Sequence, residues 1–541
     1  MRIFVLSTAL ALAATGALAD VTYNVVGFPE DKGSFGVVIN KKMTPMTTTN
    51  ATYPLWTVTV PGASGGSGWR YVKLSPEGKE IQRESFLRSF VNKKSTVTDN
   101  QVFLRINTKT SLPALPQVYT NVEPLPSKAF DETQMATIHI TANEADFADM
   151  VAHPLDEERK ALKCGFRFIN ADTIYSAAEV KVKVSGHGSR KYQKLSLRVK
   201  FDQDKGETFF DRPIIKLRSE TSDPTLIREK TYGDILNAIG VKASQAAWVR
   251  VYVNNKPFGF HLMMEDIEEP FLRTTIHKGQ QVPKDLGSLY QMGSHVVGEE
   301  ATMLYLGPNT TNYNPETYEN KIRGDNTKAE PMAQLIAFMK DLQEYDPTLP
   351  NAVKFWNTRL DVDGFLKAMV MEYLAGAWDS YWWKGNNFFM YYNPVNARWQ
   401  FIATDFDSTF SDGGRADVLT TYKKFAASRM RRSGKDHPLV SKLIYKNKEI
   451  NALFEKTLLT VTQKVFNPNV LNPRLDAYAK MIEDEVKWDL AINRSKNPGK
   501  KSFSFDDFQK SMNGPVTGVT IGIKPWIAGR AKDVPPQITK K

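Results

Sequence analysis

The chain has 541 residues, a formal net charge of +12 and a hydrophobic share of 41%. This length is too great for one compact core, so two or three domains are expected, and the hydrophobic share excludes a largely disordered chain. The positive charge by itself favours a solvated basic surface over an acidic or phosphate-rich partner. The basic cluster at 421–437 lacks a base-stacking pattern and a DNA-reading motif, so the sequence predicts no nucleic-acid partner.

The first nineteen residues have the pattern of a secretory signal peptide. Arg2 precedes an apolar run that ends in Ala-Leu-Ala, the small-residue pattern of a cleavage site. We therefore expect residues 1–19 to be removed and the protein to be secreted, as a glycoprotein if the acceptor sites at Asn50, Asn309 and Asn493 are used. No later segment predicts a transmembrane helix, and the polar C-terminus lacks a lipid-anchor signal.

Short predicted strands dominate residues 20–125. Runs of β-branched and aromatic residues alternate with clusters of Gly, Pro and Asn, which is typical of an all-β domain. A small β-sandwich-like fold is therefore expected for this N-terminal domain. The proline-rich stretch 110–130 indicates its boundary.

Residues 126–269 follow the order strand, turn, strand, strand, helix, strand, strand. The helix is expected at 223–240, with Asp223 as its cap, Pro224 in its first turn and Gly240 at its end. The last two strands, at 246–254 and 256–266, are expected to form a hairpin. The segment therefore indicates a β-rich region with one helix.

The remaining chain is mainly helical. Residues 270–330 are irregular and rich in Gly and Asn, and we interpret them as an insertion or a covering loop. Helical patterns and one hairpin fill the rest of 270–480, and 481–541 is interpreted as a C-terminal extension. We therefore expect an α+β fold in which an N-lobe at 126–269 and a C-lobe at 270–480 form an atypical bilobal protein-kinase-like fold.

The turn at 185–191 could cover phosphates. Gly186 and Gly188 permit close backbone approach, and Arg190 supplies hydrogen-bond donors. Glycine-containing hairpin turns are common without any ligand, so the turn alone does not show whether it covers phosphates or only connects two strands.

A strand lysine and a helix glutamate have the order of a kinase ion pair. Lys216 lies on the third predicted strand of the series, and Glu229 follows thirteen residues later on the predicted helix. Lys194 is the alternative cation for the phosphates. An ordinary surface ion pair would give the same pattern.

Acidic and amide residues crowd the segment 379–407. Asp379 follows an apolar helix and could orient or deprotonate a hydroxyl group. Asn387 begins one predicted strand, and Asp405 and Asp407 follow the end of the next. Asparagine and aspartate oxygens at the ends of adjacent strands suit Mg²⁺. A solvent-exposed hairpin with polar ends would use the same residue types, so both interpretations stay open.

Four ordered motifs resemble the spore-coat protein H (CotH) kinase-like family over roughly residues 135–480. They are GHGSRKYQKLSLRVKF, IIKLRSETSDPTLIREKTYGDIL, VRVYVNNKPFGFHLMMEDIEEPFL and NNFFMYYNPVNARWQFIATDFDSTF. The resemblance implies transfer of the γ-phosphate of ATP, with Mg²⁺ or Mn²⁺, to Ser or Thr of extracellular or secretory-pathway proteins. Surface, coat or host proteins are the substrates that it suggests.

The resemblance also implies roles for individual residues. Asp379 would be the catalytic acid, Asn387 and Asp405 would bind the metal, and Asp407 belongs to the same Asp-Phe-Asp motif. Met264 would lie in the hinge between the lobes, where the backbone could bond to an adenine edge. Some fungal members are surface ligands for host receptors, so a non-catalytic secreted adhesin or invasin-type module is the alternative. The sequence names neither the substrate nor the oligomeric state.

Overall fold

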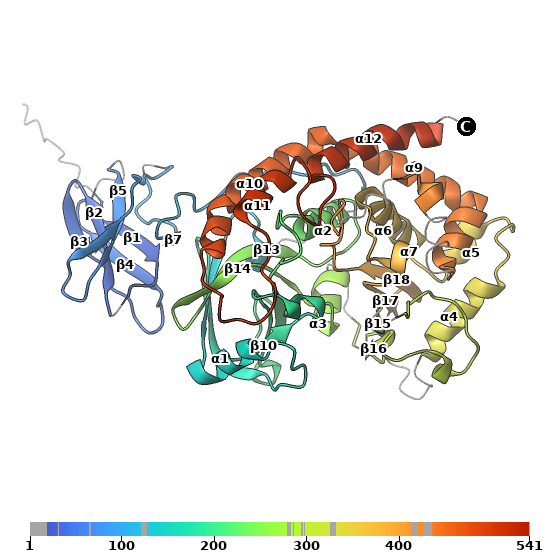
Figure 1. Ribbon diagram of the computed structural model, residues 1–541, viewed down its shortest axis with the longest axis horizontal. Coiled ribbons are helices and arrows are strands. Elements are labelled where there is room, and N and C mark those ends of the chain that lie inside the picture. Colours follow the sequence, from blue (N-terminus) through green and yellow to red (C-terminus); the bar gives the residue numbers. More distant parts are fainter. Residues whose placement is uncertain are drawn as a thin grey trace, which may run out of the picture. The chain divides into compact units, whose positions relative to one another are not determined.

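The structure is a computed structural model (Figure 1). It describes residues 19–539 except 31, 64–66, 93, 121–126, 279–282, 285, 294–295, 297, 325–331, 414–419 and 426–434. Residues 1–18 of the predicted signal peptide and much of the basic cluster at 421–437 therefore lie outside the described residues. The chain forms two compact units, one of Met1–Lys109 with Phe168–Tyr175 and one of Thr110–Arg167 with Ser176–Lys541.

The first unit contains two β-sheets in which most neighbouring strands are antiparallel. One has the strand order β4-β1-β7, from β1 (Val21–Val26), β4 (Leu55–Val60) and β7 (Gln101–Val102). The other has the order β3-β2-β5-β6, from β2 (Ser34–Ile39), β3 (Lys42–Pro45), β5 (Trp69–Leu74) and β6 (Glu80–Arg83). Side chains of both sheets share one core, in which the rings of Tyr23 and Trp69 meet edge to face at 5.2 Å. The predicted N-terminal β-sheets are confirmed.

The second unit begins with a closed β-barrel of strand order β10-β11-β12-β14-β13-β8-β9. Its strands are β8 (Ala136–Thr141), β9 (Leu162–Ile169), β10 (Ile174–Ser185), β11 (Ser196–Phe201), β12 (Ile214–Arg218), β13 (Ala246–Val253) and β14 (Lys256–Glu265), with α1 (Glu144–Ala152) after β8. Every second side chain of β11 and of the second half of β10 is apolar, as in the cross-strand pair Val182 and Val199, and both are fully buried. This alternation is the signal by which the two strands could be recognised in the sequence, whereas their closure into a barrel was not predicted.

Helix α2 (Arg228–Ala238) begins five residues later than predicted. Asp223 is fully buried, and its carboxylate accepts hydrogen bonds from the backbone N–H groups of Thr225, Ile227 and Arg228. Leu226 has φ 56, which interrupts helical geometry between Pro224 and the helix. Asp223 thus holds an extra turn ahead of α2 instead of capping the helix directly.

A four-stranded sheet of order β16-β15-β17-β18 follows the barrel. It contains β15 (Leu289–Met292), β16 (Tyr318–Ile322), β17 (Phe388–Asn393) and β18 (Arg398–Ala403). The first two strands lie in the segment 270–330, which was interpreted as an irregular insertion or covering loop, so the prediction missed these two strands. Both strands have five residues or fewer, and their sequences lack a sustained hydrophobic alternation.

Helices complete the second unit. They include α3 (Glu269–Phe271), α4 (Ala333–Glu344), α5 (Ala352–Trp356), α6 (Val362–Ala375), α7 (Tyr381–Lys384), α9 (Lys448–Lys464), α10 (Pro468–Leu490), α11 (Phe505–Ser511) and α12 (Ile523–Thr539), and a π-helical segment at Leu439–Lys446. Helices α10 and α12 run side by side (Figure 1). Among the described residues, no helix is both long and apolar enough to cross a membrane.

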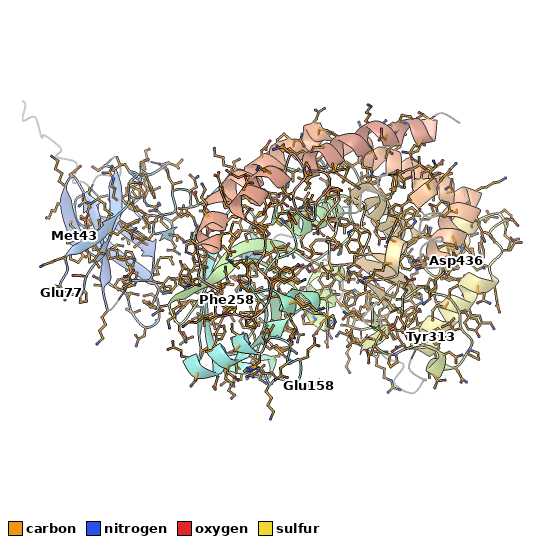
Figure 2. All side chains as sticks on the ribbon, in the orientation of Figure 1. Met43, Glu77, Glu158, Phe258, Tyr313 and Asp436 are labelled. Atoms are coloured by element: carbon orange, nitrogen blue, oxygen red, sulfur yellow. The ribbon has the colours of Figure 1, made fainter. Side chains whose placement is uncertain are left out.

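The C-terminal segment is part of the helical core. Trp526 of α12 is fully buried, and its indole N–H donates to the Leu374 carbonyl of α6 at 2.8 Å. Charged loop side chains such as Glu77 and Glu158 point outward instead (Figure 2). The α+β class predicted for the chain is confirmed.

Candidate functional site

One arginine at the end of strand β12 faces four carboxylates. The Arg218 Nη2 lies 2.5 Å from Asp405 Oδ1 and 2.9 Å from Asp407 Oδ2. The same nitrogen lies 3.8 Å from Glu229 Oε2, and the Arg218 Nε lies 2.7 Å from Glu220 Oε1. Strand β12, the segment that follows it, the first turn of α2 and the segment after β18 supply these residues. The cluster therefore joins the barrel to the sheet of β17 and β18.

The Asp-Phe-Asp segment at 405–407 is attached to α2 through its middle residue. The ring of Phe406 stacks on that of Tyr232 with centroids 4.2 Å apart, and both side chains are buried. The Phe406 N–H donates to Glu229 Oε2 at 2.5 Å. Asp405 has φ 62, a conformation uncommon outside glycine. With Phe406 fixed in the core, the carboxylates on both sides of it reach Arg218.

Asp379 is held in the loop between α6 and α7. Helix α6 ends at Gly376, whose φ of 62 places it in the left-handed region that suits a helix end. The Asp379 Oδ1 accepts hydrogen bonds from Lys384 Nζ at 2.6 Å and from Asn386 Nδ2 at 3.3 Å. Its Oδ2 accepts from Asn387 Nδ2 at 3.2 Å. The carboxylate is thus fixed from both sides and remains partly exposed.

The structure brings Asp379, Asn387 and Asp405 to the same end of the β17–β18 hairpin. Phe388 pairs with Ala403 across these strands, and the Thr404 N–H donates to the Asn387 carbonyl at 3.2 Å. Asn387 therefore precedes one strand at the point where Asp405 follows the other. Asp379 is close enough for its charge to act on Asp405. This proximity is observed, whereas the catalytic and metal-binding roles of the three residues stay predictions.

The carboxylates of the cluster differ in their affinity for protons. Burial raises the pKa of Glu229 to about 7, and the neighbouring aspartates act in the same direction while Arg218 opposes them. Burial likewise raises the pKa of Glu220 well above its ordinary value. Burial also acts to raise the pKa of Asp407, but the charge of Arg218 and the hydrogen bond from Ser222 together lower it. Glu220 and Glu229 therefore hold their protons more tightly than Asp407, whose ionised form Arg218 stabilises.

Partial burial raises the pKa of Asp405. The positive charge of Arg218 opposes this effect, and the negative charges of Asp407 and Asp379 add to it. A cation close to Asp405 would lower the pKa of this carboxyl group, because a positive charge stabilises the ionised carboxylate.

The donor set fits a cation that arrives together with phosphate groups. Within the described residues, no three His, Cys, Asp or Glu side chains are grouped as a metal site on their own. The centre offers the Asp405 and Asp407 carboxylates and the amide of Asn387, and Mg²⁺ is commonly held by one or two carboxylates and by substrate phosphates. In the part of the chain that is described, Glu229 Oε1 is buried without a hydrogen-bond partner, which is consistent with a site short of positive charge.

The predicted pairing of Lys216 with Glu229 is wrong. Lys216 Nζ lies 2.7 Å from Asp266 Oδ1, just beyond β14, and Arg218 takes the place beside Glu229. Lys216 and Arg218 are two residues apart on β12 and therefore share one face, about 7 Å apart along the strand. Only Arg218 lies at the strand end, where the cluster forms.

The predicted phosphate-covering turn is held by Arg190 as part of the fold. The Arg190 guanidinium donates to the carbonyls of Gly186, Pro154 and Val184 at 2.6, 2.7 and 3.0 Å, and the residue is 7% exposed. Gly186 has φ 83, so a glycine suits this position whether or not a ligand binds. Gly188 begins a short 3₁₀ turn. The contacts of Arg190 thus differ from the phosphate contacts predicted for it.

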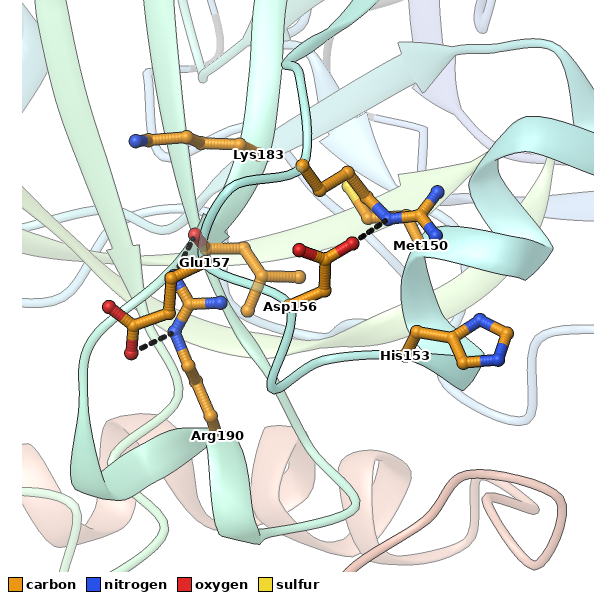
Figure 3. Close-up of a pocket in the computed structure, with 8 residues that line it drawn as sticks. Met150, His153, Asp156, Glu157, Lys183 and Arg190 are labelled. Atoms are coloured by element: carbon orange, nitrogen blue, oxygen red, sulfur yellow. Dashed lines mark hydrogen bonds and ion pairs between the residues drawn. The ribbon is translucent and has the colours of Figure 1, made fainter.

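A small pocket beside this turn has room for about one water molecule. Its volume is about 10 Å³, and Met150, His153, Asp156 and Arg190 contribute to its lining (Figure 3). A second pocket of about 100 Å³ is lined by residues of β10 and β11. Neither pocket is lined by residues of the acidic cluster, and both are smaller than a nucleotide requires.

Two further predicted binding residues lie inside the fold. Lys194 is 4% exposed, and its Nζ lies 2.9 Å from Asp489 Oδ2 of helix α10, so it joins this helix to the barrel. Met264 pairs with Lys216 of β12 on one side and with Ala246 of β13 on the other. Because β14 is paired along both edges there, a free backbone edge for an adenine could begin only after Glu265.

Sequence reasoning missed Arg218, Glu220 and Glu372. Period-two alternation from Lys216 would have placed Arg218 on the same strand face, which is the signal that was available; Glu220 lies beyond the end of the strand and has φ 51. Glu372 lies inside the hydrophobic helix α6, and its Oε2 accepts the Trp382 N–H at 2.7 Å. Burial raises the pKa of Glu372 to about 8, although the backbone N–H groups of α7 oppose this effect. Glu372 thus fixes α7, which follows Asp379.

A closed barrel, a helical region and a carboxylate-rich site between them define an α+β protein with a centre suited to a cation. The chain belongs to the CotH kinase family, because the family model described as CotH kinase protein matches residues 182–513. The predicted family resemblance is confirmed.

Named relatives occur in a fungus and in a bacterium. The chain is 28% identical to Invasin CotH3 of Rhizopus delemar over 99% of this chain and 87% of the relative. It is 27% identical to Invasin CotH2 of the same fungus over 83% of this chain and 75% of the relative. It is 24% identical to Inner spore coat protein H of Bacillus subtilis over 58% of this chain and 78% of the relative.

Proposed function

We propose that the protein is a secreted kinase that transfers the γ-phosphate of ATP to Ser or Thr of extracellular or secretory-pathway proteins. The barrel and the helical region would be the two lobes, and the nucleotide would bind next to the acidic centre. Membership of the CotH kinase family supports the activity. The observation that carries the assignment of the site is the meeting of Asp379, Asn387 and Asp405 at one end of the β17–β18 hairpin.

The residues of the centre suggest how each would act. Asp405 and the Asn387 amide oxygen would hold Mg²⁺ or Mn²⁺, which supplies charge neutralisation at the phosphates when bound. Asp379 would orient the acceptor hydroxyl and take its proton while the bond from the acceptor oxygen to the γ-phosphorus forms and the bond to the leaving oxygen of ADP breaks. Lys384 and Asn386, which donate hydrogen bonds to Asp379 Oδ1, would keep this carboxylate oriented.

Substitution of Asp405 tests the proposal. Asp405→Asn keeps the size of the side chain but removes its charge, and we expect Mg²⁺-dependent transfer of labelled phosphate to an acceptor protein to fall at least about a hundredfold. Asp506→Asn is the matched control, since Asp506 is exposed on α11 and pairs with Lys510. Transfer that survives Asp405→Asn in a folded protein would contradict the catalytic assignment.

A non-catalytic ligand module is the second candidate. The observation that favours it is the similarity to two fungal proteins named invasins, one of which aligns with nearly the whole chain. This candidate predicts binding to a host-surface protein that is unaffected by Asp405→Asn. Binding and phosphate transfer measured on the same variant therefore separate the two candidates, and N-terminal sequencing of protein exported from the producing cell tests secretion.

A further inference from the structure

Arg218 occupies the space between the two carboxylates of the Asp-Phe-Asp segment. Its Nη2 is within 3 Å of both Asp405 Oδ1 and Asp407 Oδ2, so one nitrogen contacts both side chains. Two carboxylate oxygens brought to a single positive centre are the arrangement that a divalent cation would also require. The guanidinium of Arg218 therefore lies at the position where such a cation would contact the two carboxylates.

Two further carboxylates beside Arg218 are buried. Glu220 and Glu229 are both about 3% exposed, and Glu229 Oε1 has no hydrogen-bond partner within the described residues. Carboxylates buried together remain ionised only if cations neutralise them. Arg218 carries a single charge, whereas a divalent cation would supply two.

Arg218 lies at a partly exposed end of its strand. Its side chain is 22% exposed, and it lies at the last residue of β12, where the ladder pairing with β14 ends. A second contact, from its Nε to Glu220, would keep the base of the guanidinium in place while Nη2 moves. Arginine binds phosphate oxygens in the same two-pronged way in which it binds carboxylates, so a nucleotide offers it an equivalent partner.

We propose that Arg218 is a resident substitute for the divalent cation in the nucleotide-free protein, and that it moves to the nucleotide phosphates when the cation binds Asp405 and Asp407. This inference rests on the proposed kinase function. Without nucleotide, Arg218 and the cation would compete for the carboxylates of Asp405 and Asp407. With nucleotide bound, the cation would contact these carboxylates while Arg218 contacts the phosphates.

Metal binding to the full-length protein tests the competition. Mn²⁺ is the probe, and free Mn²⁺ is measured by electron paramagnetic resonance with and without a non-hydrolysable ATP analogue. We expect Arg218→Met to raise Mn²⁺ affinity at least about tenfold without nucleotide, and to lower the affinity for the ATP analogue at least about tenfold in the presence of Mn²⁺. The two effects have opposite signs, which a simple loss of structure would not produce.

Arg198→Met is the matched control. Arg198 lies on the adjacent strand β11, opposite Lys216, and its guanidinium also contacts two carboxylates, those of Asp266 and Glu268. Removing it should leave Mn²⁺ affinity without nucleotide within about twofold. Unchanged or weaker Mn²⁺ binding in folded Arg218→Met would overturn the inference. Wild-type protein that binds no Mn²⁺ even with the ATP analogue would instead overturn the proposed function.

A second measurement needs no substitution. Phenylglyoxal modifies accessible arginines, and peptide mass spectrometry reports the extent of modification at each site. We expect Mg²⁺ alone to increase the modification of Arg218 at least about threefold and Mg²⁺ with ATP to suppress it, because the two ligands move the guanidinium between solvent and phosphate. Arg198 should show neither change. Arg218 modification that is indifferent to Mg²⁺ would contradict the proposal whether or not Arg218→Met folds.

Discussion

Replacing Glu372 by glutamine should make the protein more stable at alkaline pH. Glu372 is 1% exposed within α6, and burial raises the pKa of its carboxyl group from an ordinary 4.5 to about 8. The folded state thus holds a proton on Glu372 that the unfolded chain releases. Glutamine keeps an acceptor for the Trp382 N–H and has no proton to lose.

The sign and size follow from this pKa difference. Because the folded-state pKa is the higher one, the contribution of Glu372 to stability is fully present below pH 4.5 and is lost as the pH rises through about 8. A difference of about 3.5 in pKa, at about 1.4 kcal/mol for each unit, corresponds to a loss of up to about 5 kcal/mol. The variant should therefore match the wild type near pH 4.5 and exceed it by several kcal/mol above pH 8.

Urea unfolding followed by tryptophan fluorescence, at pH values from 5 to 9, measures this difference. The free energy of unfolding of Glu372→Gln minus that of the wild type should rise by about 1 kcal/mol per pH unit. Glu229 titrates in the same range, but it is present in both proteins and its effect cancels in the difference. A difference that stays constant from pH 5 to 9 would refute the reasoning and show that Glu372 is ionised in the folded protein.

Two further substitutions test the packing around the site and the reassigned turn. Phe406→Ala removes the buried ring that stacks on Tyr232, and it should lower the free energy of unfolding by about 3–5 kcal/mol, measured by urea unfolding. The same substitution should reduce phosphate transfer in a transfer assay. An unchanged free energy of unfolding would show that the stack contributes little. Arg190→Met removes three hydrogen bonds to backbone carbonyls and should lower stability by about 2–3 kcal/mol, while nucleotide affinity in a titration stays within about twofold. A large loss of nucleotide affinity would restore the phosphate-binding role predicted from the sequence.

The parts of the fold that were predictable are those with a strong local signal. The alternation through Val180, Val182 and Val184 identifies a half-buried strand because successive side chains point to opposite faces. Asp361 and Gly376 delimit α6 because a side-chain acceptor and a left-handed residue suit its two ends. Asp379 and Asp405 could be found because each lies within four residues of the end of such a regular element.

The parts that were not predictable depend on contacts between distant segments. Lys216 and Arg218 have the same charge and lie on the same face of β12. Only the position of α2 determines which of them lies beside Glu229. Arg190 resembles a ligand-binding arginine until the distant Pro154 carbonyl is seen to accept one of its hydrogen bonds. The four-residue strand β15 becomes a strand because β16 and β17 flank it, and its own sequence is too short to show this.

The closed barrel sets a lower limit on the length of any functional fragment. The segment that matches the family begins at residue 182, within β10, and ends at 513, before α12. A protein trimmed to that segment would lose β8 and β9, leave β10 and β13 as open strand edges, and uncover the face of α6 on which Trp526 sits. Exposed edges and uncovered helices promote aggregation, so expression should retain the chain from at least residue 136 to the end of α12.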